Sequence, residues 1–312
     1  MNETLGLILT GINDNPLGEL TQARSLAAVP FCGRYRLIDF VLSAMVNSGI
    51  SNVGVPTLTY YRSLMDHLGS GKEWDLNRKL DGLFILPPYI NRESTDSRGG
   101  DLDVLNGIMD YISHTSQKYV LLTSADTLFN TTFFELYDSH ASSQADVTVM
   151  SVRAPGDCRP PMKSVLLETD GSGRVTDIEV GVARCRQSDL ISMGIYYMEK
   201  SFLEHQISRC ISRGLHDFVM DVLIKNITSA NIRAFVYGGY VGRIDSIHSY
   251  YRANMSILDP DICAELFNPE TPVYTKVKDQ VPTIYGENAR VSNSIIADGC
   301  RINGTVENSV IF

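Results

Sequence analysis

The sequence predicts an α/β fold with a mostly parallel sheet, followed by the start of a parallel β-helix. Four apolar runs, at residues 5–11, 51–58, 119–124 and 146–152, alternate with amphipathic stretches. This alternation is typical of a parallel sheet covered by helices on both faces. Near the end of the chain, Ile296 and Ile302 lie six residues apart among small and polar residues, and a six-residue period indicates β-helix coils.

The first sixty residues predict a strand, a loop, a helix and a second strand. The run at 5–11 ends in a turn at Gly11, and residues 34–49 carry apolar side chains at helical spacing. Gly49 is placed to end that helix. The unit is the basic repeat of a parallel α/β sheet.

The later elements divide the chain further. Residues 163–180 predict a hairpin with its turn at 170–173, residues 245–259 predict a helix, and the Pro- and Thr-containing segment 269–286 predicts a linker. We therefore expect an α/β domain at 1–243, a helix and linker at 244–283, and a β-helix start at 284–312. Because the sequence stops in mid-repeat, we expect a truncated chain.

Composition excludes several classes of protein. The formal charge of −9, without clustered Lys or Arg, argues against a nucleic-acid partner. No apolar run is long enough to span a membrane and no signal peptide begins the chain, so we expect a cytoplasmic protein. The six cysteines form no C-x-x-C pair and the six histidines show no metal-ligand spacing.

Four segments together carry a resemblance to a known family. Residues 20–49 (LTQARSLAAVPFCGRYRLIDFVLSAMVNSG), 192–198 (SMGIYYM), 250–255 (YYRANM) and the six-residue repeat at the end resemble the bacterial glucose-1-phosphate adenylyltransferases. The resemblance implies a Rossmann-like (GT-A-like) nucleotidyltransferase domain followed by a left-handed β-helix. Such proteins join ATP and glucose 1-phosphate to give ADP-glucose and pyrophosphate in glycogen biosynthesis, with Mg²⁺ as cofactor.

The family's triphosphate loop is only partly retained. Gly11 and Arg24 match it and are expected as remnants of nucleotide binding. Four positions depart: Ile12 and Asp14 replace glycines, Pro16 replaces an arginine, and Leu26 replaces a lysine. A phosphate cradle needs glycines for close backbone approach and cations for charge. Each altered charge at ~4 Å corresponds to roughly 4 kcal/mol at an effective dielectric near 20.

The metal site implied by the resemblance is also incomplete. Asp126 follows the apolar run 119–124 and matches the first metal carboxylate. Tyr240, within Gly239 to Gly242, occupies the place of the second one. A lone carboxylate is a poor Mg²⁺ site, so we expect that this chain binds Mg²⁺ badly.

Other family positions are mixed. Gly100 and Asp103 match the turn near the nucleotide base, and Ser192 and Gly194 match the sugar-side motif. Gly181 stands at or beside the place of the lysine that binds the sugar phosphate. No complete catalytic set remains.

Losses at several independent points indicate the D-type (GlgD-type) subunit of this family. The resemblance implies a chain that is inactive or weakly active alone and joins a catalytic C-type subunit in a heterotetramer, with a homotetramer as the alternative. Two other hypotheses stay open. One is a competent sugar-phosphate nucleotidyltransferase in which Arg24, Arg34 and Arg36 supply positive charge to ATP. The other is a sensor of a phosphorylated metabolite.

Overall fold

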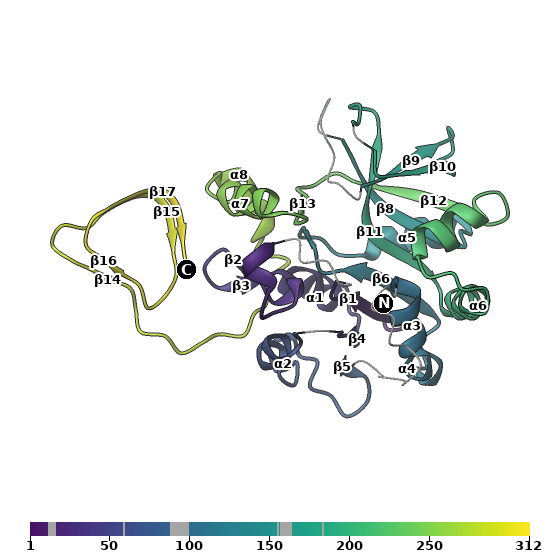
Figure 1. Cartoon of the computed structure of the whole chain (residues 1–312), viewed down its shortest axis with the longest axis horizontal. Coiled ribbons are helices and arrows are strands. Elements are labelled where there is room, and N and C mark those ends of the chain that lie inside the picture. The colour runs from purple at the N-terminus through teal and green to yellow at the C-terminus, as the bar shows by residue number, and fades with distance from the viewer. Residues whose placement is uncertain (12–16, 59, 88–99, 155, 157–163, 183) are drawn as a thin grey trace.

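A computed structural model describes residues 1–312 except 12–16, 59, 88–99, 155, 157–163 and 183. Within the described residues, a nine-stranded sheet forms the centre of the molecule (Figure 1). Its strands are β1 (Thr4–Leu9), β4 (Asn52–Pro56), β5 (Gly82–Leu86), β6 (Tyr119–Ser124), β8 (Val147–Arg153), β9 (Val165–Thr169), β10 (Val175–Val180), β11 (Leu190–Glu199) and β12 (Ile232–Tyr237).

The sheet is mostly parallel, as the sequence predicts. Its main path runs β10-β9-β11-β6-β1-β4-β5, and β8 pairs with both β11 and β12. Among these strands, only β10 and β11 run against the others. The predicted strands at 5–11, 51–58, 119–124 and 146–152 are confirmed, and the hairpin is β9 and β10.

Helices cover both faces of the sheet. One apolar cluster packs under α3 (Asp101–Gly107), α4 (Met109–His114) and α6 (Lys200–Ile211). The other packs under α1 (Leu37–Asn47), α2 (Arg62–Leu68) and α5 (Phe134–Ser143). In β1, Leu5, Leu7 and Leu9 join the first cluster and Ile8 joins the second, because successive side chains of a strand point to opposite faces.

The helix predicted at 34–49 is α1. It begins later than predicted, since Tyr35 and Arg36 form β3 (Tyr35–Arg36), which pairs with β2 (Pro30–Phe31). Gly49 ends it with a left-handed φ of 76°, and its N–H donates to the Val46 carbonyl at 2.8 Å. Glycine adopts this conformation without strain, which is why it ends helices.

A third apolar cluster joins the β2–β3 hairpin to the predicted helix at 245–259. That helix is α7 (Ile247–Ser256), and α8 (Pro260–Leu266) follows it. The Tyr250 hydroxyl donates to the Pro30 carbonyl at 2.7 Å, and the Cys32 N–H donates to Asn254 Oδ1 at 3.1 Å. Both helices therefore pack directly on the α/β domain.

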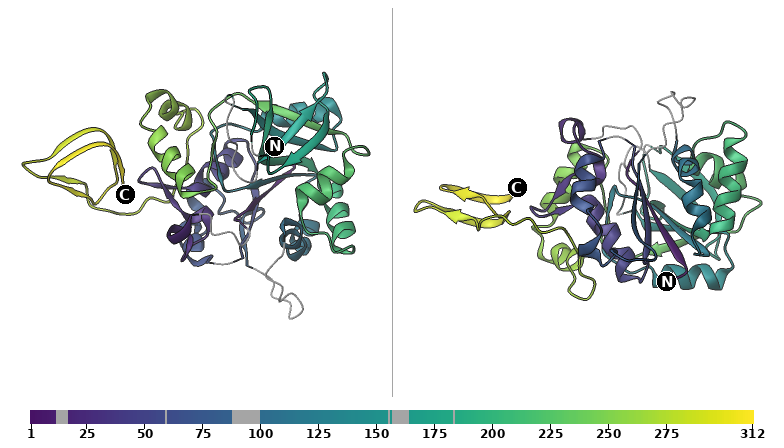
Figure 2. Two further views of the ribbon diagram at one scale, coloured as in Figure 1. Left: turned by 45° about the horizontal axis from the view of Figure 1, so that its top comes forward. Right: turned by 90° about the horizontal axis from the view of Figure 1, so that it is seen from below.

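The last strands fit the start of a β-helix. They are β14 (Ile284–Tyr285), β15 (Arg290–Ile296), β16 (Arg301–Ile302) and β17 (Thr305–Ile311). β14 pairs in parallel with β16, and β15 with β17, so that successive coils stack. Figure 2 shows these coils at one end of the molecule, beyond α7 and α8. No helix in the described part of the chain is long and apolar enough to cross a membrane.

A buried contact between a histidine and a carboxylate joins α2 to the start of α1. Asp39 Oδ1 lies 2.6 Å from His67 Nε2, and neither side chain is more than 2% exposed. Asp39 Oδ2 also accepts from the Arg36 N–H at 2.9 Å, which caps α1. The Trp74 ring meets the His67 ring edge to face at 5.8 Å. Removing one member of such a pair leaves a polar group buried without its partner.

We predict that His67→Ala lowers the free energy of unfolding by about 3 kcal/mol, because it isolates the Asp39 carboxylate. Urea denaturation measures the change. The matched control is His114→Ala, since His114 is exposed and bonds a carbonyl in its own helix, and it should change stability by less than about 0.5 kcal/mol. Equal effects of the two substitutions would contradict the structural role of the buried pair.

Candidate functional site

The candidate site lies at the carboxyl end of β6, where parallel sheets bind ligands. Asp126 connects β6 to β7 (Thr127–Leu128). β7 pairs in antiparallel fashion with β13 (Gly242–Arg243), and Thr127 lies opposite Arg243. The Ile244 N–H donates to the Asp126 carbonyl at 2.7 Å. This short ladder brings the two matched metal-site segments together.

The ladder places a guanidinium beside the Asp126 carboxylate. Arg243 Nη2 lies 3.5 Å from Asp126 Oδ2, and the two side chains are only 20% and 17% exposed. Sequence reasoning missed Arg243, because the matched motif stops at Gly242. The signal was a cation directly after that motif. Asp126 is therefore balanced by a positive charge that belongs to the chain.

Tyr240 contacts the helices α7 and α8. Its hydroxyl lies 2.7 Å from Ser256 Oγ at the end of α7, and its ring packs against the third apolar cluster. Its backbone N–H donates to the Glu265 carboxylate on α8. Burial raises the pKa of the Tyr240 hydroxyl. The residue at the second carboxylate's place is thus part of the packing between the domain and its following helices.

The residues of this site do not fit Mg²⁺. That ion requires oxygen ligands in near-octahedral geometry, usually one or two carboxylates with phosphates and water. Here one carboxylate is paired with a guanidinium and the second place holds a phenol. The described part of the chain contains no group of three or more His, Cys, Asp or Glu side chains that could hold a metal ion.

Further acids surround the ion pair. Asp101, the first residue of α3, is partly buried, and this burial together with the negative charges of Asp217 and Asp126 raises its pKa to about 6. Asp217 itself caps η4 (Phe218–Leu223), since its Oδ1 accepts from the Met220 N–H at 2.7 Å. The region is electronegative, which is the opposite of a triphosphate cradle.

Gly100 and Asp103 join α3 to the chain before η4. Asp103 Oδ2 accepts from the Gly100 N–H at 2.7 Å, and Asp103 Oδ1 lies 2.9 Å from His216 Nδ1. The Leu102 N–H donates to the His216 carbonyl at 3.0 Å. A Cβ on Gly100 would collide with that carbonyl oxygen. Here the matched glycine and aspartate make contacts within the chain.

Ser192 and Gly194 lie together in β11. Ser192 is buried, and its Oγ accepts from the Gly194 N–H at 3.2 Å. The Ser192 side chain also hydrogen-bonds Tyr196, whose pKa burial raises to about 12. Gly194 has a left-handed φ of 72°, and the pairing of β11 with β8 shifts register between Ser192 and Ile195. The two residues matched to the sugar-side motif therefore lie at a local irregularity in the central strand β11.

The matched nucleotide loop runs from Gly11 into the segment 12–16. That segment, with the departures Ile12, Asp14 and Pro16, lies outside the described residues. Gly11 has a φ of 95°, and a Cβ built on it would lie 3.9 Å from Leu26 Cβ. Leu26, at the place of a family lysine, packs against the third apolar cluster. An apolar side chain therefore borders this strand end.

The three candidate arginines are placed differently from one another. The Arg36 guanidinium is buried and donates to the Ala28 carbonyl at 2.5 Å and to Ser63 Oγ at 3.0 Å. Arg34 is exposed and lies 3.4 Å from Asp298 in the β-helix. Arg24 is half-buried and near enough to Arg36 to lower the Arg36 pKa, after burial itself. Two of the three are thus engaged within the chain.

Gly181 directly follows β10. Its φ is 74° and its N–H donates to the Ser164 carbonyl at 3.0 Å, while the space beyond its Cα is open. A lysine at this place would have to adopt a left-handed backbone, which L side chains adopt only with strain.

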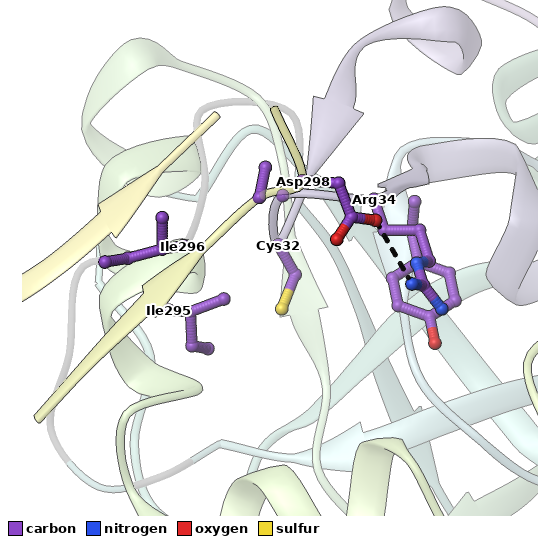
Figure 3. A pocket seen from close by; sticks show the side chains of 8 residues that line it. Cys32, Arg34, Ile295, Ile296 and Asp298 are labelled. Carbon is purple, nitrogen blue, oxygen red and sulfur yellow. Dashed lines mark hydrogen bonds and ion pairs between the residues drawn. The ribbon is translucent and has the colours of Figure 1, made fainter. Parts of the chain in front are cut away.

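A separate cavity of about 210 Å³ lies between the β2–β3 hairpin and the first β-helix coil. Figure 3 shows Ile295 and Ile296 together on the left, Cys32 in the middle, and Asp298 beside Arg34 on the right. The Arg34 to Asp298 ion pair crosses this space. The residues matched to the nucleotide, sugar and metal sites do not line the cavity, so it is distinct from the Asp126 region.

Comparison with known proteins identifies the class that this fold and site define. The nucleotidyl transferase family matches residues 5–259. The chain therefore belongs to the nucleotidyl transferase family, in the group that contains GlgD proteins and glucose-1-phosphate adenylyltransferases.

The similarity to three relatives supports this assignment. The chain is 40% identical over 311 residues to the glycogen biosynthesis protein GlgD of Geobacillus stearothermophilus and 35% identical over 312 residues to that of Bacillus subtilis. It is 34% identical over 318 residues to the glucose-1-phosphate adenylyltransferase of Thermotoga maritima. Each match covers 100% of this chain, and 80%, 80% and 74% of the respective relative.

We predict that Gly100→Ala lowers the free energy of unfolding by about 1–3 kcal/mol, because the added methyl group forces the His216 carbonyl away. Gly107→Ala, in the last turn of the same helix, is the matched control. Nothing lies within 4 Å of its added Cβ, and alanine favours helix there. Thermal unfolding of both variants is the measurement, and a Gly100→Ala variant as stable as Gly107→Ala would be contrary to the prediction.

The raised pKa of Asp101 predicts how the free energy of unfolding changes with pH. The folded state holds the Asp101 proton more tightly than the unfolded chain, whose pKa is near 3.8. The contribution of Asp101 to the free energy of unfolding therefore falls as pH rises from about 4 to about 6, and stays low above that. Asp101→Asn should stabilise the protein at pH 7 by on the order of 1–3 kcal/mol and have little effect near pH 4.

Urea denaturation at several pH values measures this difference. Asp110→Asn is the control, because Asp110 is exposed on the neighbouring helix α4 and should give no gain that grows with pH. A gain from Asp101→Asn that is the same at pH 4 and pH 7 would show that the carboxylate is not the cause.

Proposed function

We propose that this chain is a D-type, GlgD-like subunit of glucose-1-phosphate adenylyltransferase. It acts in glycogen biosynthesis, makes little or no ADP-glucose alone, and modifies the activity of a catalytic C-type subunit. The observation that carries this proposal is the ion pair between Arg243 and Asp126, which lies where the family reaction needs a divalent cation.

The chemistry of the family reaction supports a weak or absent activity. Transfer of a nucleotidyl group is mainly positioning and charge neutralisation on phosphates. In this chain the strand end beside Gly11 is bordered by Leu26, the sugar-phosphate lysine is replaced by Gly181, and acids lie around Asp126. Each difference either removes a positive side chain that would contact the substrate phosphates or places negative charge near them.

The retained scaffold supports a role in assembly. The sheet and the helices α7 and α8 pack through apolar clusters, and Ile295 of the first β-helix coil packs against the third of them. A chain that keeps this scaffold can occupy a subunit position beside a catalytic copy. Its relatives of 35% and 40% identity carry the name glycogen biosynthesis protein GlgD. We propose a heterotetramer with the C-type subunit.

The alternative of a competent enzyme needs free cations at the ATP site. Arg36 donates to a backbone carbonyl and a serine, and Arg34 pairs with Asp298. These contacts favour structural roles for both arginines. Arg24 remains the candidate for a phosphate contact.

We predict that the pure chain synthesises ADP-glucose at less than about 1% of the rate of a catalytic C-type subunit, since losses at several charged positions multiply. Pyrophosphate release from ATP and glucose 1-phosphate is the measurement. A mixture of the two chains should differ from the C-type subunit alone in its maximal rate or its substrate dependence.

Two results would contradict the proposal. Substantial ADP-glucose synthesis by the pure chain, with micromolar metal-dependent ATP binding by calorimetry, would favour a competent enzyme. A mixture that behaves as the C-type subunit alone, with no complex on size-exclusion chromatography, would remove the regulatory role.

A further inference from the structure

We propose that Arg243 replaces the divalent cation at Asp126: its guanidinium neutralises the carboxylate and keeps Mg²⁺ out of the site. The inference deepens the proposed function, on which it rests, by naming the residue that makes this site independent of metal. The presence of Tyr240 in place of a carboxylate explains only a weaker metal site. The inference adds that the Arg243 side chain supplies the positive charge that a metal ion would otherwise supply.

Backbone pairing fixes Arg243 in this place. Arg243 lies opposite Thr127 in the β7–β13 ladder, and the next residue, Ile244, donates its N–H to the Asp126 carbonyl at 2.7 Å. Ile244 is itself fully buried in the third apolar cluster. The side chains of Arg243 and Asp126 are about four-fifths buried, so their contact differs from a mobile surface ion pair.

The chemistry of the guanidinium makes it an effective substitute. It stays charged at all physiological pH values, unlike a lysine or histidine that could lose its proton on burial. A divalent cation that approached Asp126 would have to displace the guanidinium and then remain close to it. Repulsion between the two positive charges opposes that arrangement.

The surroundings explain why the replacement charge matters. Burial raises the pKa of Asp101, and the negative charges of Asp217 and Asp126 raise it further. Arg243 extends its influence across the same region, since it lowers the pKa of Tyr196 against the larger effect of burial. Without Arg243, this group of acids would attract cations. With it, the carboxylate nearest to the family metal position is already paired.

The acids also argue against a second use of Arg243 as an anion receptor. Arg243 is already paired with Asp126, and the charges of Asp126 and Asp217 both act on the nearby Asp101. A phosphate would meet net negative charge there. The observations therefore favour exclusion of a metal over recruitment of a phosphate.

The test uses Mn²⁺ as a paramagnetic probe of divalent binding, measured by electron paramagnetic resonance of the full chain without substrates. Wild type should bind Mn²⁺ no better than Asp126→Asn. Wild-type binding that Asp126→Asn abolishes would overturn the inference, because it would show that Arg243 does not block the carboxylate.

A pair of variants isolates the contribution of Arg243. Tyr240→Asp restores the second carboxylate but retains Arg243, and it should not bind Mn²⁺ at this site. Adding Arg243→Thr should tighten Mn²⁺ binding on the order of tenfold or more, since a like charge is removed beside the metal. Equal binding by the single and double variants would contradict the inference.

Tyr240→Asp disturbs a packed ring, so a second comparison keeps Tyr240. Arg243→Thr should gain weak Mn²⁺ binding that the charge-retaining Arg243→Lys lacks and that an added Asp126→Asn removes. Circular dichroism confirms that each variant is folded. If Arg243→Thr is folded and gains no binding over Arg243→Lys, the inference is wrong.

These measurements distinguish a failure of this inference from a failure of the proposed function. A chain that binds no Mn²⁺ at Asp126 yet makes ADP-glucose would refute the regulatory subunit while leaving the role of Arg243 intact. A chain that binds Mn²⁺ through Asp126 yet makes no ADP-glucose would refute the role of Arg243 and leave the proposed regulatory subunit intact.

Discussion

The pairing of β7 with β13 is the constraint on which the candidate site depends. Two residues on each side bring the end of β6 against the segment that leads into α7. The backbone bond from Ile244 to Asp126 and the burial of Ile244 fix the register. This pairing places Arg243 opposite Thr127, within reach of the preceding Asp126, while Tyr240, which lies before β13, joins the packing of α7.

The residues that match the family's binding motifs make structural contacts in this chain. Gly100 permits the close approach of the His216 carbonyl, and Asp103 both caps α3 and contacts His216. Ser192 and Gly194 form a local irregularity in β11. All of these contacts are made between residues of this chain. A chain could therefore keep such motifs for folding after the chemistry at their centre has changed.

Sequence reasoning predicted the elements whose signal is local. The apolar runs of β1, β4, β6 and β8, the hairpin turn at 170–173, the stop at Gly49 and the six-residue period each depend on neighbouring residues, and all appear in the fold. The reversed direction of β11 depends on distant partners and has no local signal. Arg243 was missed for the same reason, since its partner Asp126 is distant in sequence and is reached only through the β7–β13 ladder.

Charge balance explains why a tyrosine at position 240 and an arginine at position 243 occur together at this site. The site that the family implies holds two carboxylates and one divalent cation, whose charges sum to zero. In this chain Asp126 and Arg243 also sum to zero, with Tyr240 uncharged. Losing one carboxylate alone would leave Asp126 largely buried beside Asp101 with no reliable counter-ion, and such a charge is strongly destabilising. The guanidinium supplies that counter-ion, so the strand end can keep its backbone and the Asp126 carboxylate without a metal.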